Sequence, residues 1–288
     1  MRWEDGEQGG NIEDRRGMRP RVGAGGGIGL GGVAILLIGY FVFGIDPSTL
    51  MGAMQQDGGS YTQEAGRQGA PTDRSGKFVD VILTSTTRVW TGILQKTSKP
   101  YRQPQPLVLY TQATGTGCGM GQSAMGPFYC PSDERIYVDL DFFNELSSRF
   151  GAPGDFAKAY VIAHEVGHHV QKVLGTAAQV QAAQRRAGNR AKANRYSVAL
   201  ELQADCYAGV WASKAEAASN GAITISRSDL EDGLRAANAI GDDTLQKQSQ
   251  GQVVPDSFTH GTSAQRMDWL RRGFDSGDPA ACNTFSSL

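Results

Sequence analysis

The sequence lacks several features that would each have indicated a function. Its formal net charge is only −1 over 288 residues, so the chain has no overall attraction to nucleic acid or to acidic polymers. Its four cysteines form no C-x-x-C pair, which argues against a cysteine zinc site or a thioredoxin-like redox motif. No internal repeat is visible, and histidine is as scarce as cysteine, with four residues. The chemistry must therefore come from a few residues.

The apolar fraction of 40% is ordinary and allows a packed core. The length suits one sizeable domain, alone or with appendages. Much of the glycine, 38 residues in all, falls in the first quarter of the chain. We therefore expect that quarter to lie outside the core.

Charge is also missing from a long stretch near the N-terminus. No charged residue occurs between Arg21 and Asp46, and a bilayer requires about 20 apolar residues. We predict a transmembrane helix over residues 22–45. Two alternatives are a glycine-rich loop followed by a buried core segment, and a signal peptide cleaved after Ala53.

Basic residues indicate the orientation of this helix. Four arginines cluster just before it and no Lys or Arg follows until Arg67, so the positive-inside rule places the N-terminus in the cytoplasm. The predicted divisions are a cytoplasmic segment (1–21), the membrane helix, a flexible linker (46–76) and a catalytic domain (77–288). The protein would be a single-pass inner-membrane protein with a periplasmic or otherwise extracytoplasmic domain. The arginines are Arg15, Arg16, Arg19 and Arg21.

The pattern after Lys77 predicts an α+β fold that is mostly α, with a small sheet before the active-site helix. Short apolar runs predict the strands, and apolar residues at helical spacing predict the helices. The expected strands are 107–110, 128–130 and 136–140. The expected helices are 78–94, 155–174 with Asp155 as N-cap, a polar stretch after Gly175, 197–217, 228–240 and 262–273.

The helix at 155–174 contains the motif H-E-x-x-H. His164 and His168 are four residues apart and so lie on one helical face, where both imidazoles can reach one metal ion. Glu165 projects near the same edge and can act as a general base. The alternative is an ordinary helix with two satisfied histidines. His169 points away from the pair and is interpreted as structural or exposed.

A catalytic zinc site needs a third protein ligand and an open position. Val170, Gln171 and Lys172 stand where a further histidine would identify a metzincin. The best candidate ligand is Glu201. Asp205, four residues later on the same face, can accept a hydrogen bond from a ligand histidine. The alternative is a solvated acidic pair, although the surrounding residues are largely apolar.

These motifs resemble known peptidases. H-E-V-G-H followed by E-L-Q-A-D looks like the gluzincins, whose third ligand is a glutamate on a second helix, and is similar to the HtpX-like membrane peptidases. The chain resembles more closely the bacterial neutral zinc metallopeptidase family, the YpfJ-like proteins. The matching segments, with the N-terminal membrane segment, are G-C-G-M-G-Q-S-A-M-G-P-F-Y-C-P, A-H-E-V-G-H-H-V-Q, E-L-Q-A-D-C and H-G-T-S-A-Q-R.

The resemblance implies a zincin-like domain that hydrolyses peptide or protein substrates with one Zn²⁺ per chain. A zinc-activated water would attack the peptide bond, with Glu165 as general base. Similarity to the HtpX-like enzymes further implies that His260 stabilises the transition state. A lone loop histidine can equally be structural, and the sequence leaves this open.

Four cysteines allow three disulfide pairings. Cys118 and Cys130 are close in sequence and flank a turn, so we predict that they pair. That leaves Cys206 to pair with Cys282. Disulfides suit an oxidising compartment, in agreement with the predicted extracytoplasmic domain.

Two other functions remain open: a non-catalytic membrane-anchored scaffold with a structural metal, and a zinc amidase that acts on cell-wall material. A nucleic-acid partner is not expected, because the basic stretch at residues 185–195 contains no interleaved aromatic residues. The sequence gives no indication of oligomeric state.

Overall fold

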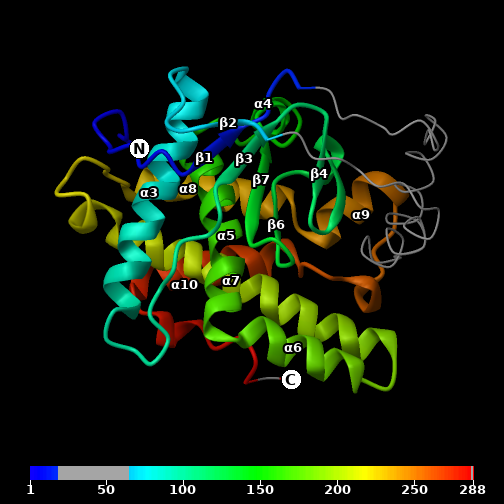
Figure 1. The fold of residues 1–288 in the computed structure, drawn as a ribbon. Helices are drawn as coiled ribbons and strands as arrows, with labels where there is room; N and C mark the ends of the chain where they lie inside the picture. The colour runs from blue at the N-terminus through cyan, green and yellow to red at the C-terminus, as the bar shows by residue number, and fades with distance from the viewer. Residues whose placement is uncertain (19–64, 287) are drawn as a thin grey trace.

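The computed structural model describes residues 1–18, 65–286 and 288 (Figure 1). Helices predominate among these residues, and the strands form a small sheet and a hairpin, so the predicted mostly helical α+β class is confirmed. The predicted membrane segment, residues 22–45, lies outside the described residues. Within the described part, none of the helices combines the length and apolar character needed to cross a bilayer.

The main sheet has five strands in the order β2-β1-β3-β7-β6. Strands β1, β3 and β7 run parallel, and β2 and β6 are antiparallel edge strands. Side chains alternate between its faces, as the two-residue repeat of a strand requires. Leu107 and Leu109 join the main core, whereas Val108 and Tyr110 form a smaller cluster on the opposite face. The strands are β1 (Ile12–Asp14), β2 (Arg67–Gln68), β3 (Leu107–Tyr110), β6 (Phe128–Cys130) and β7 (Arg135–Asp139).

Between β3 and β6, the chain forms a separate hairpin of β4 (Ala113–Thr116) and β5 (Gly119–Gln122). The segment is rich in glycine and has few apolar residues, so the sequence predicted no strand here.

The helices build one core around α5 and α7. Helix α5 contacts β6 on one side and α7 on the other, and α7 also packs against α3, α6 and α10 (Figure 1). The helices are α3 (Arg74–Leu94), α4 (Asp141–Ser148), α5 (Asp155–Leu174), α6 (Thr176–Arg185), α7 (Arg190–Ala218), α8 (Arg227–Ala239), α9 (Asp242–Gln250) and α10 (Ser263–Ser276). The part of the chain that the structure describes also contains three 3-10 turns: η2 (Ser123–Met125), η3 (Pro255–Ser257) and η4 (Pro279–Cys282).

Residues 1–18 differ most from the predicted organisation. They do not form a separate segment, because β1 lies inside the sheet between β2 and β3. Trp3 is buried and packs edge-on against Phe78 of α3. The buried carboxylate of Glu13 pairs with Arg15 at 2.7 Å. Hydropathy could not reveal this strand, since Ile12 is its only apolar residue and its two carboxylates pair with arginines outside the strand.

The start of the main domain also differs from the prediction. Residues 65–76 were assigned to a flexible linker, but they carry β2 and the first turn of α3. Asp73 caps α3 by accepting a hydrogen bond from the backbone N–H of Gly76. Residues 1–18 and 65–286 therefore belong to one folded unit.

Candidate metal centre

The centre is built on α5, which the sequence predicted over the same residues. Its N-cap is Gly154 rather than Asp155, whose carboxylate instead accepts a hydrogen bond from the indole N–H of Trp3 at 3.0 Å. Gly175 ends the helix in the left-handed conformation, with φ 80°. The middle of the helix is buried, and His164 and His168 lie one turn apart on the face toward α7.

Helix α7 supplies the third candidate ligand. Asn189 caps it, accepting a hydrogen bond from the backbone N–H of Lys192. The two helices approach closely at Gly167, where a Cβ atom would lie 3.1 Å from the Cα and carbonyl oxygen of Ala204. This approach requires small residues at both positions. It explains the glycine of H-E-V-G-H and the alanine of E-L-Q-A-D.

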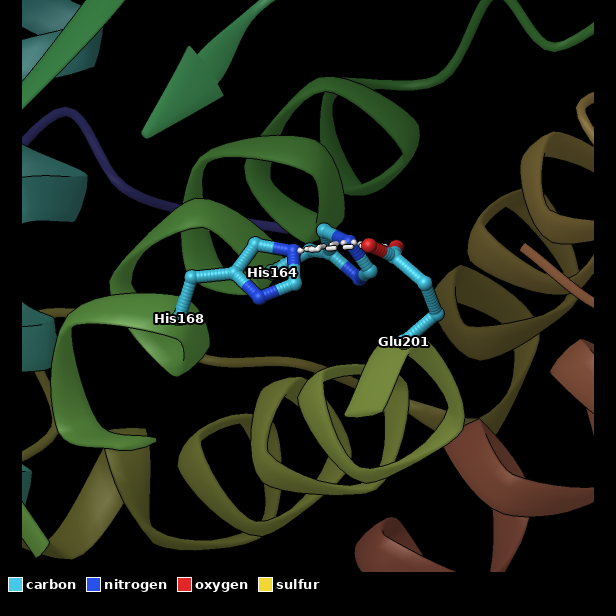
Figure 2. Close-up of side chains that lie close together, drawn as sticks. All are labelled: His164, His168 and Glu201. Atoms are coloured by element: carbon cyan, nitrogen blue, oxygen red, sulfur yellow. Dashed lines mark hydrogen bonds and ion pairs between the residues drawn. The ribbon is translucent and has the colours of Figure 1, made fainter. Parts of the chain in front are cut away.

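The three predicted ligands converge (Figure 2). His164 Nε2 lies 3.1 Å from His168 Nε2 and 3.1 Å from an oxygen of Glu201, whose other oxygen lies 3.4 Å from His168 Nε2. Tetrahedral zinc ligands at about 2.0–2.1 Å from the ion stand about 3.3 Å from one another. The donor types and their spacing therefore fit zinc.

A hydrogen bond at Nδ1, the ring nitrogen that does not face the other ligands, fixes the orientation of His164. Its Nδ1 lies 2.8 Å from Asp205 Oδ1, so the carboxylate accepts a hydrogen bond from Nδ1–H and turns Nε2 toward the metal position. Asp205 is fully buried and also accepts hydrogen bonds from Tyr160 Oη at 2.6 Å and from Arg266 at 2.9 Å. The Arg266 guanidinium on α10 balances the charge of the buried carboxylate.

His168 has a neutral partner instead. Its Nδ1 lies 3.0 Å from Gln171 Oε1, and the Gln171 amide donates to the carbonyl oxygen of Leu200 and to Gln203 Oε1. Gln203 in turn donates to the carbonyl oxygen of Cys282. A buried chain of amides thus connects the ligand to the C-terminal segment.

The carboxylates and imidazoles of the centre shift each other's protonation. Burial opposes the charged ring of His164, but Asp205 and Glu201 outweigh it and raise the pKa of His164 to about 10. Burial would raise the pKa of Glu201, but His168 and His164 hold it well below its usual value. The site favours an anionic Glu201 and therefore attracts a cation.

Glu165 lies beside the three ligands and is 7% exposed. Burial raises the pKa of its carboxyl group, although the backbone N–H of Tyr129 on β6 and the neighbouring histidines lower it in part. A raised pKa makes the carboxylate a better proton acceptor, as general-base chemistry requires.

His169 does point away from the metal ligands, as the sequence indicated, and it is fully buried. Its Nε2 donates to the carbonyl oxygen of Arg102 at 2.7 Å, and its Nδ1 accepts from the hydroxyl of Tyr129 at 3.0 Å. Burial lowers the pKa of His169, in agreement with a neutral ring. This residue holds β6 against α5 and faces no metal ligand.

His260 lies in the loop before α10, and its side chain is 34% exposed. The charges of His260 and Glu201 are close enough to shift each other's pKa, lowering that of Glu201 and raising that of His260. The structure thus brings His260 to the neighbourhood of the ligands. Its ring nitrogen Nδ1 lies 3.1 Å from Asp242 Oδ1.

The structure also pairs the cysteines as predicted. Cys118 is bonded to Cys130, which joins the β4–β5 hairpin to β6, and Cys206 is bonded to Cys282. Cys206 follows Asp205 directly, so the second disulfide fixes the C-terminal segment beside the metal centre.

Sequence reasoning missed the residues that hold the side chains of the site in place, directly or through another residue: Tyr160, Gln171, Gln203, Asp242 and Arg266. Gln171 and Arg266 belong to the A-H-E-V-G-H-H-V-Q and H-G-T-S-A-Q-R segments. These segments carry the family resemblance, so they could have indicated that both residues contribute to the site. Neither segment shows what these side chains contact. Such contacts depend on how the helices pack.

Comparison with known proteins identifies the family. Residues 1–285 match the family described as "Putative neutral zinc metallopeptidase". The protein YpfJ of Escherichia coli (strain K12) is 49% identical over 297 aligned residues, which cover 99% of each chain. Rv2575 of Mycobacterium tuberculosis (strain ATCC 25618 / H37Rv) is 42% identical over 233 residues, covering 77% of this chain and 74% of its own. No solved structure matches the chain. The family that the sequence motifs indicated is confirmed: the chain belongs to the neutral zinc metallopeptidases, which are hydrolases with a Zn²⁺ cofactor.

Proposed function

We propose that this protein cleaves peptide bonds with one zinc ion held by His164, His168 and Glu201, in a zincin-like arrangement. The observation that carries this proposal is the convergence of their three ligand atoms, all within 4.8 Å of one another, beside the buried Glu165. Three protein ligands leave one position of a tetrahedral ion open, as catalysis requires, whereas structural zinc is usually closed by four.

The chain's own groups have distinct roles in this proposal. Zinc, when bound, acts as a Lewis acid that polarises the scissile carbonyl and lowers the pKa of a water toward about 7. Glu165 accepts a proton from the attacking water and delivers it to the leaving amine. Asp205 and Gln171 hold the two imidazoles in place. His260 donates a hydrogen bond to the oxyanion that develops on the carbonyl.

We also propose that the enzyme acts outside the cytoplasm and that residues 22–45 attach it to the membrane. The two disulfides support an oxidising compartment, because cytosolic thiols are kept reduced. The pairing of β1 with β2 and β3 restricts how residues 22–45 can be placed in the membrane. Residues 1–18 and the catalytic unit must lie on the same side of the membrane, which a single crossing between them does not allow.

Replacing Glu165 tests the proposal. The full-length protein and its Glu165→Gln variant are incubated with a peptide library and analysed for zinc. Glutamine keeps the shape of the side chain but accepts no proton, so we expect turnover to fall by about 10²–10⁴-fold while zinc stays bound. The control is Glu145→Gln, the same change on the exposed side of α4.

Two results would contradict the proposal. A zinc-loaded parent that cleaves no peptide would favour the non-catalytic scaffold. Release of amide fragments from peptidoglycan, with no cleavage of the peptide library, would favour the cell-wall amidase.

A further inference from the structure

The first residue of α9 holds the loop that carries His260. Asp242 is 8% exposed, and its Oδ2 atom accepts hydrogen bonds from three consecutive backbone N–H groups. These belong to Thr259 at 2.7 Å, His260 at 2.7 Å and Gly261 at 3.1 Å. The backbone N–H of Asp242 donates in return to the Gly261 carbonyl oxygen at 2.9 Å. One side chain therefore fixes the backbone on both sides of the histidine.

The second oxygen of the same carboxylate faces the ring. Asp242 Oδ1 lies 3.1 Å from His260 Nδ1, and an ionised carboxylate only accepts hydrogen bonds, so Nδ1 carries a proton. Nε2, on the opposite edge of the ring, makes no hydrogen bond to any residue that the structure describes. With a third of the side chain exposed, Nε2 is available to a bound molecule.

The ring lies at the edge of the metal centre. The next residue, Gly261, rests on α7, where an added Cβ atom would lie 3.2 Å from side-chain atoms of both Val198 and Leu202. These two residues bracket Glu201 on the helix. Burial disfavours the charged form of His260, but Asp242 and Glu201 outweigh it and raise its pKa, while Arg266 opposes them.

We propose that Asp242 is a positioning residue for the hydrolytic reaction, which holds the His260 loop and ring so that Nε2 faces the group being hydrolysed beside His164, His168 and Glu201. This inference rests on the proposed peptidase function. Asp242 touches no substrate and acts only through His260. Its carboxylate keeps the ring charged, and a charged donor forms a stronger hydrogen bond to a developing oxyanion than a neutral one.

The neighbouring Asp243 provides a matched control. Its Oδ1 accepts from the backbone N–H and the hydroxyl of Ser263, both at 2.8 Å, and makes no hydrogen bond to the His260 ring. Asp242→Asn and Asp243→Asn therefore make the same chemical change on the same turn, and only the first touches the histidine.

The kinetic test measures kcat, KM and zinc content for both variants of the full chain, each with His260 intact and with His260→Ala. We expect Asp242→Asn to lower kcat by about 10–100-fold, with KM and zinc content preserved. Asp243→Asn should leave kcat nearly unchanged. In the His260→Ala background, Asp242→Asn should cause no further loss. An equal loss in both backgrounds would overturn the proposal, because independent effects multiply.

A second readout does not depend on turnover. In Asp242→Asn the three backbone N–H groups still require an oxygen, so the amide NH₂ must face the ring, and Nδ1 must become an acceptor. Nitrogen-15 NMR of the ring, in a chain with only four histidines, should show the proton leaving Nδ1. An unchanged Nδ1 proton would overturn the proposal. A parent that binds zinc but hydrolyses nothing would refute the peptidase function, and the NMR result would still report on Asp242.

Discussion

At the residue scale, the two ligand histidines are oriented by different kinds of partner. His164 donates a hydrogen bond from Nδ1–H to the carboxylate of Asp205, and His168 donates one from its own Nδ1–H to the amide oxygen of Gln171. Both arrangements leave Nε2 free to bind metal. Arg266 compensates the carboxylate, so the pair adds little net charge to the buried centre.

The raised pKa of His164 predicts that zinc binding releases protons. Without metal, this pKa of about 10 keeps the ring charged at neutral pH, and zinc requires a free Nε2 lone pair. Zinc affinity should therefore rise with pH up to that pKa and fall as the solution is acidified. Calorimetric titration at pH 7 in two buffers with different heats of ionisation should give different apparent enthalpies. Equal enthalpies would show that no proton is displaced.

The residues that converge at the candidate metal centre could be predicted from the sequence because their spacing is local. Four-residue spacing on a helix defines His164 with His168 and Glu201 with Asp205 before any packing is known. The partners Tyr160 and Arg266 could not be predicted in this way. Tyr160 reads as one more core aromatic of α5, and Arg266 as one of several arginines on α10. Their roles arise only when α5, α7 and α10 meet.

At the element scale, glycine allows α10 to reach the ligand-bearing helix. A Cβ atom at Gly273 would lie 1.9 Å from the carbonyl oxygen of Cys206, and one at Gly209 would lie 2.2 Å from that of Leu270. The obstacles are backbone atoms, which cannot rotate aside. The contact adjoins Asp205, so the spacing of α7 and α10 also sets the position of Arg266.

Gly273→Ala should therefore destabilise the protein. Overpacking of this kind costs roughly 1–3 kcal/mol, more than the helix propensity that alanine gains. Gly92→Ala on α3 is the matched control, since nothing lies within 4 Å of its added Cβ atom, and it should raise stability slightly. Urea unfolding measures both effects. A Gly273→Ala variant as stable as the parent would show that the helices can move apart freely.

Apolar periodicity predicted many of the elements, since β3, β6 and α5 have the bounds expected and α3, α8 and α10 differ by a few residues. Helix α7 was expected over 197–217 but begins at Arg190, because its first turns consist mainly of charged and polar residues. Several elements with few large apolar residues, among them α9, β4 and β5, were not predicted. Helix α9 contains Leu245 as its single large apolar residue, and β4 and β5 are mostly Gly and Thr. These elements are stabilised by hydrogen bonds to other segments, such as those of Asp242. The spacing of apolar residues in the sequence does not reveal such bonds.

At the scale of the whole molecule, two of the N-terminal arginines form ion pairs inside the folded unit, so they are not free charges that could orient a membrane helix. Arg15 is buried against Glu13, and Arg16 pairs with Asp14 and Asp73. The positive-inside rule applies to free charges that flank a membrane helix. Two of the four arginines used to orient the chain are instead part of the folded unit, which is why this orientation conflicts with the strand pairing.

Labelling of added cysteines tests the compartment. The four natural cysteines are paired, so Asp5→Cys and, as the reference, Lys214→Cys each add one free thiol at an exposed position. In cells with an intact inner membrane, an impermeant maleimide should label both. Labelling of Lys214→Cys alone would show that residue 5 lies across the membrane. If neither added cysteine is labelled, the whole unit lies in the cytoplasm.

The position of β1 also determines what a shortened chain would do. A chain that began at Lys77 would keep all the metal ligands but lose β1 and β2. The backbone of β3 would become an open edge, and the parts of the core filled by Ile12 and Trp3 would be vacated. Unpaired strand edges next to exposed apolar side chains recruit strands from other molecules. Such a fragment would self-associate through β3, and its inactivity would reflect aggregation rather than the chemistry of the zinc site.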